Sequence, residues 1–234
     1  MTSGTLYGIG LGPGDPDLIT LKAARLIAAV PVVAYPTLEA GDSFARSIAA
    51  GFVPAGAQEL PIPIPMTTDR APAQAAYDAG AAAIAAHLDA GRDVAVLCEG
   101  DPFFYGSFMY LFSRLSGDHR VEVVPGVTSV TACAAVVGQP LSARNEVLTI
   151  LPCSLHEPEL KARIEAASSV AIIKVGRHLN KIRRVLGDLS LIGHAVYVER
   201  ATLPNECYAP LAEAPEKAPY FSMILVSRGK DPWL

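Results

Sequence analysis

Short apolar runs alternate along the chain with longer stretches of helical character. The runs at 5–11, 93–98 and 120–124 are rich in Val, Leu and Ile, as buried strands are. The stretch at 72–90 is rich in Ala and has the length of a helix. Strands that alternate with helices in this way indicate an α/β protein with a largely parallel sheet.

The same pattern predicts the order of the elements. Strands are expected at 5–11, 30–35, 93–98, 120–124, 146–151, 170–175, 194–199 and 221–227, and helices at 16–29, 43–50, 72–90, 109–115, 129–137, 157–166 and 180–186. Residues 58–66 are expected to be extended, because three prolines alternate there with apolar residues and exclude a helix. The polar turn at 116–118 predicts a boundary between an N-terminal α/β domain, 1–117, and a C-terminal one, 118–234.

Composition and charge exclude several classes of partner. The chain has 23 acidic and 19 basic residues, a net charge of −4, and no dense basic stripe, so we expect no nucleic-acid partner. The N-terminus lacks the features of a signal peptide and no apolar run is long enough to span a bilayer, so we expect no membrane association. The four cysteines and five histidines are scattered, which indicates reduced thiols, a cytoplasmic location and no metal site.

One tripeptide occurs twice, each time after a predicted strand. Gly14-Asp15-Pro16 follows the first strand and Gly100-Asp101-Pro102 follows the strand at 93–98. Glycine lets a ligand approach the backbone, and the carboxyl ends of strands are where open α/β sheets bind ligands. A third glycine, Gly126, follows the strand at 120–124. The sequence therefore predicts three loops that converge on one small molecule.

Other interpretations of these loops exist. The glycines at 8, 10, 12 and 14 invite a dinucleotide site, but the Gly-x-Gly-x-x-Gly spacing fails and the acidic residue expected about 20 positions later is missing. The loops are also explained if Asp101 only caps a turn and the aromatic residues after it belong to the core.

Taken together, the motifs resemble those of the tetrapyrrole (corrin/porphyrin) methylases. The matching segments are 7–16 with 18–23, then 100–105, then 124–129, with looser matches at 196–201 and 223–229. The resemblance covers nearly the whole chain. Segments 65–69 and 105–110 narrow it to members that methylate a meso carbon of a reduced tetrapyrrole.

The resemblance implies a fold, a cofactor and a site. The fold would be two α/β domains with a cofactor cleft between them, in a homodimer. The cofactor would be S-adenosylmethionine, the methyl donor, without a metal. Its contacts would be Pro13, Glu99, Gly100, Asp101, Phe104, Thr128 and Ser129, with Val175, Ala201 and Met223 in the C-terminal half. At the last group this chain departs from many relatives, which have Met before Gly176 and Gly in place of Ala201.

The substrate implied is a small tetrapyrrole that carries many carboxylates, so cations should line its site. The candidates are Arg144, Arg177, Lys181, Arg184 and Arg200, each of which is also explained as a solvated surface charge. Tyr105 is a candidate catalytic residue and is expected to form a wall of the substrate slot. Three alternatives stay open: a sister enzyme that methylates another ring carbon or a cobalt-bearing substrate, a dinucleotide-dependent oxidoreductase, and a carrier without catalytic activity.

Overall fold

The computed structural model describes residues 3–38, 41–65 and 69–228, and the chain divides into two compact units, 1–128 and 129–234. Each unit has its own sheet and its own core. The boundary between the units lies further along the sequence than the 116–118 turn, where it was expected. That turn leads into β5 (Arg120–Val124), and β5 pairs with β1 (Thr5–Gly10) in the first sheet.

The sheet of the first unit is parallel throughout. Its strands are β1, β2 (Val32–Thr37), β3 (Gln58–Pro63), β4 (Val94–Cys98) and β5, in the order β3-β2-β4-β1-β5. Strand β1 thus lies between β4 and β5, with Leu6 opposite Val94 and Val121. The carboxyl ends of these three adjacent strands lie at one edge of the sheet, as the three predicted loops require.

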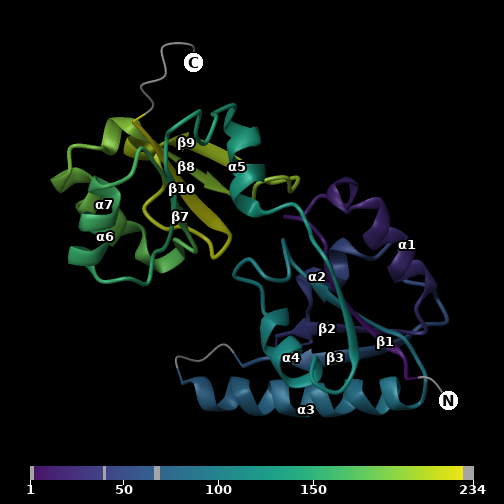
Figure 1. The fold of residues 1–234 in the computed structure, drawn as a ribbon. Coiled ribbons are helices and arrows are strands. Elements are labelled where there is room, and N and C mark those ends of the chain that lie inside the picture. The colour runs from purple at the N-terminus through teal and green to yellow at the C-terminus, as the bar shows by residue number, and fades with distance from the viewer. Residues whose placement is uncertain (1–2, 39–40, 66–68, 229–234) are drawn as a thin grey trace. The chain divides into compact units, whose positions relative to one another are not determined.

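Helices cover both faces of this sheet (Figure 1). The helices are α1 (Leu21–Ala29), α2 (Phe44–Ile48), α3 (Arg70–Asp89) and α4 (Phe108–Leu115). One core layer joins α3 and α4 to Leu6, Val94 and Val96, and the other joins α1 and α2 to Ile9 and Leu97. Alternate residues of each strand face opposite layers, which explains why β4 is buried along its whole length.

The segment after β1 forms two short elements, where the sequence predicts a single helix over 16–29. Residues Pro16–Leu18 form a 3₁₀ turn that begins at Asp15, whose carboxylate accepts the Asp17 N–H at 2.9 Å. The chain then becomes extended and restarts at Thr20, whose hydroxyl accepts the Ala23 N–H at 3.2 Å. Thr20 is thus a second N-cap, and α1 begins there as a helix separate from the 3₁₀ turn.

The sheet of the second unit is mixed, which corrects the expectation of a largely parallel sheet for this half. Its strands are β6 (Leu148–Pro152), β7 (Ser169–Ile173), β8 (Ala195–Glu199), β9 (Cys207–Pro210) and β10 (Ser222–Ser227), in the order β6-β7-β10-β8-β9. Only β6 and β7 are parallel, and the other three pairs are antiparallel. Local sequence sets the length of a strand, whereas its direction follows from where the connecting segments lead it.

Two helices cover one face of this sheet. Helices α6 (Glu157–Glu165) and α7 (Leu179–Asp188) pack on it through Leu160, Ile164 and Ile182, with the fully buried Tyr197 in the same core. Helix α5 (Ser129–Val137) contacts β8 and β10. Figure 1 shows β10 between β7 and β8. Because β10 runs antiparallel to both, its start lies beside the ends of both neighbours.

Candidate functional site

The first two glycine loops are joined by backbone hydrogen bonds. Gly12 and Gly100 form an isolated antiparallel bridge, in which the Gly12 N–H donates to the Gly100 carbonyl at 3.2 Å and the Gly100 N–H donates to the Gly12 carbonyl at 2.7 Å. Just before this bridge, the Leu11 N–H donates to the Cys98 carbonyl at 2.9 Å. The loops after β1 and β4 therefore continue the pairing of their strands past the edge of the sheet.

The third loop packs on the first two with no room for a side chain. A Cβ on Gly126 would lie 2.1 Å from the Gly100 carbonyl oxygen, and a Cβ on Gly10 would lie 2.6 Å from the Gly126 nitrogen. Gly100 itself has φ of +65° and open space where a Cβ would stand. The three loops converge within the first unit, as the sequence predicts, and the small molecule expected there stays a prediction.

Asp101 links the second loop to the third through its carboxylate. One oxygen accepts the N–H of Phe103 at 2.9 Å and the other accepts the N–H of Gly126 at 3.1 Å. Side-chain oxygens that accept backbone N–H groups fix the course of a loop. The sequence left open that Asp101 only caps a turn. In the structure its carboxylate also holds the neighbouring loop.

Aromatic side chains follow directly. The rings of Phe104 and Tyr105 meet edge to face with centroids 5.2 Å apart, and Tyr105 has the left-handed φ of 56°. Phe103 packs against Phe112 of α4. An unstrained loop rarely holds a tyrosine at positive φ, so this backbone marks a position of functional interest. Pro13, Glu99 and Thr128, the other expected contacts of the first unit, are partly buried at the same loop ends.

These loops fit the cofactor that the resemblance implies. A nucleoside with an amino-acid tail needs close backbone approach, polar partners and an apolar wall. Gly100 supplies the approach, the neighbouring Glu99 a carboxylate and Phe104 an aromatic surface. The expected contacts themselves stay a prediction.

Three of the expected contacts of the second unit, Val175, Ala201 and Met223, gather at one end of its sheet. The Val175 N–H donates to the Ser222 carbonyl at 3.2 Å, and Met223 lies opposite Ile173 and Val198. Ala201 follows Arg200, whose N–H donates to the Phe221 carbonyl at 2.9 Å. Val175, Ala201 and Met223 are all buried, and Ser129 is exposed at the start of α5.

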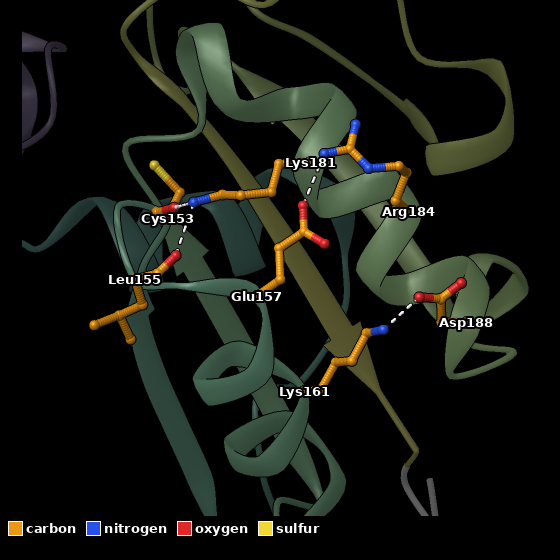
Figure 2. Close-up of polar contacts among 7 residues, drawn as sticks. All are labelled: Cys153, Leu155, Glu157, Lys161, Lys181, Arg184 and Asp188. Atoms are coloured by element: carbon orange, nitrogen blue, oxygen red, sulfur yellow. Dashed lines mark hydrogen bonds and ion pairs between the residues drawn. The ribbon is translucent and has the colours of Figure 1, made fainter.

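Lys181 and Arg184, two of the expected substrate cations, are engaged within the second unit (Figure 2). The Lys181 ammonium donates to the carbonyls of Cys153 and Leu155, the latter at 2.8 Å, and so fixes the β6–α6 loop. Arg184 pairs with Glu157 at 2.7 Å, and the neighbouring pair of Lys161 and Asp188 also joins α6 to α7. These positive charges hold the two helices and the loop together.

The remaining cations have different surroundings. Arg200 donates to the Glu199 carboxylate at 2.9 Å, and that carboxylate accepts the hydroxyl of the buried Tyr197 at 2.5 Å. Burial raises the pKa of Tyr197, and the hydrogen bond to Glu199 adds to the rise. Arg177 and Arg144 are exposed. Arg144 and Arg200 have positive φ, at 45° and 51°.

Two features that the described residues lack bear on the class of site. Within 3–38, 41–65 and 69–228, no group of three His, Cys, Asp or Glu residues could hold a metal ion. Over the same described ranges, no helix combines the length and the apolar character needed to cross a membrane.

Sequence reasoning did not find every residue that shapes the site. The contact between Gly10 and Gly126 and the two bonds of Asp101 join residues far apart in the chain, and only the Pro-Gly after β5 pointed to the third loop. Ser222 carried no signal, because a lone serine at the start of a strand has no distinguishing neighbours.

Comparisons with known proteins agree with this geometry. The profile of the Tetrapyrrole (Corrin/Porphyrin) Methylases matches residues 5–215. The "Precorrin-2 C(20)-methyltransferase" of a Sinorhizobium species is 43% identical over 97% of both chains. The "Cobalt-precorrin-2 C(20)-methyltransferase" of Salmonella typhimurium is 33% identical, also over 97% of both. The chain spans 46% of the longer "Cobalamin biosynthesis protein CobIJ" of Mycobacterium tuberculosis, at 43% identity and over 97% of its own length.

Solved structures share the fold. The cobalt precorrin-4 methyltransferase CbiF superposes with a TM-score of 0.75 at 24% identity, over 97% of this chain and 96% of that one. The uroporphyrin-III C-methyl transferase of Thermus thermophilus, complexed with S-adenyl homocysteine, has a TM-score of 0.69 at 27% identity, over 95% of this chain and 97% of that one.

Proposed function

Because the chain belongs to the tetrapyrrole (corrin/porphyrin) methylases, we propose that it transfers a methyl group from S-adenosylmethionine to C-20 of precorrin-2. The product would be precorrin-3A, an intermediate of cobalamin biosynthesis. The observation that carries the proposal is the full-length similarity to a relative named for that reaction. Segment 105–110, which includes the strained Tyr105, also supports this member of the family, whereas 66–68 lies outside the described residues.

The cofactor contacts that we propose lie on the glycine loops in the first unit and, in the second unit, on α5 and at one end of the sheet. Pro13, Glu99, Gly100, Asp101, Phe104 and Thr128 would bind from the first unit, and Ser129, Val175, Ala201 and Met223 from the second. A methyl sulfonium supplies a methyl group that a carbon nucleophile can attack directly, with the neutral thioether of S-adenosylhomocysteine as the leaving group. The chain's own residues then position the two reactants and exclude water, which is the main catalytic contribution for such a transfer.

Substrate recognition would rest on cations and an aromatic wall. C-20 of precorrin-2 attacks as an enamine-like carbon, and the ring carries carboxylates that match arginine. We propose that Arg144, Arg177 and Arg200 bind these carboxylates and that Lys181 supports the site through the loop it holds. We assign Tyr105 to the wall of the slot, with a role in orienting a proton. If the Tyr105→Phe variant methylates at the full rate, the hydroxyl has no role in orienting a proton, and Tyr105 serves only as a wall of the slot.

A turnover assay tests the function. Purified protein is incubated with labelled S-adenosylmethionine and with precorrin-2 generated in situ, and the product is analysed by mass and carbon NMR. One added methyl at C-20 is the expected result. A methyl at another carbon would identify a sister activity. If the protein binds S-adenosylhomocysteine but does not methylate precorrin-2, membership of the family stands and precorrin-2 is rejected as the substrate.

A second candidate substrate is the cobalt-bearing form. The Salmonella relative, named for cobalt-precorrin-2, favours it, although that relative is less similar than the one named for the metal-free form. The same assay with both forms, compared by kcat/KM, decides between them. We further propose that the enzyme works in the cytoplasm and that it is a homodimer. Light scattering of the purified protein tests the oligomeric state.

A further inference from the structure

Ser222, the first residue of β10, makes an unusual set of contacts for a strand residue. Its hydroxyl accepts the N–H of Gly176 at 3.0 Å and donates to the carbonyl of Pro219 at 2.7 Å. Its backbone carbonyl accepts the N–H of Val175 at 3.2 Å. The residue is 7% exposed, so water does not readily replace these partners. Ser222 therefore holds the turn after β7 by two successive N–H groups.

The hydroxyl can fill this place because it is donor and acceptor at once. Gly176 has φ of +37° and begins a short 3₁₀ turn, so its N–H points out of the regular ladder and needs an acceptor. The Pro219 carbonyl needs a donor on the other side. Alanine at 222 would leave both groups without their partner, which is costly where water is excluded.

The same short segment also holds the end of the other neighbouring strand. The carbonyl of Phe221, next to Ser222, accepts the N–H of Arg200 at 2.9 Å, directly before Ala201. Residues 221–223 thus lie between the ends of β7 and β8 and bond to both. Val175, Ala201 and Met223, three of the four cofactor contacts proposed for this unit, depend on one anchored stretch of backbone.

We propose that Ser222 is a positioning residue of the methyl-donor site. By fixing the Val175–Gly176 backbone against the start of β10, it sets the distance between Val175 and Met223 and keeps the site ready for S-adenosylmethionine. It acts through these residues and does not touch the reacting atoms. The inference rests on the proposed function, since it assigns Ser222 to the cofactor half of that site.

Ser222→Ala and Ser222→Thr test this role in the full-length protein. The dissociation constant of S-adenosylhomocysteine is measured by calorimetry, with KM for S-adenosylmethionine, kcat and the melting temperature. We expect Ser222→Ala to weaken S-adenosylhomocysteine binding and raise that KM by about tenfold, with kcat at saturation changed by less than about threefold. Ser222→Thr keeps the hydroxyl and should bind within about twofold of wild type.

Ser169→Ala is a matched control. Ser169 is also buried and lies in the adjacent strand β7, but its hydroxyl makes no hydrogen bond with any residue that the structure describes. Its loss should leave S-adenosylhomocysteine affinity unchanged. Equal affinity in wild type and Ser222→Ala would overturn the inference, and so would an equal loss in Ser222→Ala and Ser169→Ala. If Ser222→Ala does not fold, Ser222→Cys replaces it, because a thiol is a weak acceptor. Equal binding by the cysteine and threonine variants then counts against the role. A wild type that binds no S-adenosylhomocysteine refutes the proposed function instead.

Discussion

The carboxylate of Asp101 accepts the backbone N–H of Gly126 across a gap of 25 residues, at 3.1 Å. Its other oxygen accepts the Phe103 N–H at 2.9 Å, so the side chain fixes its own loop and the next one together. Asp101 therefore supports the loop geometry on which cofactor binding would depend, whether or not it also contacts the cofactor.

Asp101→Ala should weaken the binding of S-adenosylhomocysteine more than it lowers stability. Two backbone N–H groups lose their acceptor, and we expect unfolding free energy to fall by about 1–3 kcal/mol and affinity by more than about tenfold. Urea denaturation and calorimetry measure the two quantities. Asp118→Ala, at an exposed position of the same unit, should change neither. Wild-type affinity in Asp101→Ala would remove the residue from the site.

Glycines 126 and 100 should respond differently to alanine. A Cβ at Gly126 would meet the Gly100 carbonyl at 2.1 Å, so Gly126→Ala should cost about 3 kcal/mol of stability or prevent folding. Gly100→Ala has open space and should cost only about 1–2 kcal/mol for its positive φ. It should still weaken cofactor binding by about tenfold, because its methyl group would stand where the ligand is proposed.

Thermal denaturation and S-adenosylhomocysteine titration separate these two glycine effects. Gly117→Ala is the control, because its Cβ would meet no atom of the described residues within 4 Å and its φ is not left-handed. A Gly100→Ala variant with normal binding and turnover would exclude this loop from the cofactor site.

Thiol chemistry should single out one cysteine. Burial raises the pKa of Cys98 to about 11 and that of Cys133 to about 12, and Cys153 is shifted upward for the same reason. Cys207 is exposed on β9. Because the thiolate is the reactive form, a disulfide reagent at neutral pH should label one thiol quickly in the native protein and four after denaturation. The fast phase should vanish in Cys207→Ser, and its persistence there would contradict the assignment.

Acid should weaken a charged cluster in the first unit. Hydrogen bonds from Arg46, at 2.9 Å, and Tyr35, at 2.5 Å, lower the pKa of Glu59 from 4.5 to about 2. A carboxyl whose folded pKa is lowered stabilises the fold above its unfolded pKa, and this stability is lost as the pH falls from about 4.5 to about 2. Since the side chains are partly exposed, we expect only about 0.5–1 kcal/mol.

Denaturation of Glu59→Gln across that pH range measures the contribution of Glu59. The variant should be less stable than wild type at pH 7, and the difference should shrink in acid. Glu216→Gln, at an exposed position of the second unit, should show no such convergence. A constant difference at all pH values would mean that the ionised form of Glu59 is not what stabilises the cluster.

Much of the fold follows from local pattern, and the exceptions have physical causes. Strands β1, β4 and β5 were predicted nearly to the residue because compact apolar runs mark buried strands. Strand β9 was missed, since its four residues are largely exposed at the edge of a sheet and show no alternation. The antiparallel direction of β10 depends on the whole path of the chain and left no local signal.

The candidate site divides in the same way. Convergence of the glycine loops was predictable, because the carboxyl ends of parallel strands share one edge. The partners of Lys181 and Asp101 were not, because residue type tells that a side chain is charged but not which distant backbone group it will meet. The sequence therefore predicts on which helix, strand or loop each expected cofactor contact lies. The hydrogen bonds that hold these loops in place are visible only in the folded chain.

The position of β1 has a consequence for how the chain folds as it is synthesised. Strand β1 is synthesised before both of the strands with which it pairs, since Leu6 lies opposite Val94 on one side and Val121 on the other. Pairing over such sequence separations is slow, and an unpaired apolar strand is prone to aggregation until its neighbours arrive. The nascent first unit cannot complete its sheet before β5 emerges, so its three glycine loops can pack on one another only after residue 126 is made.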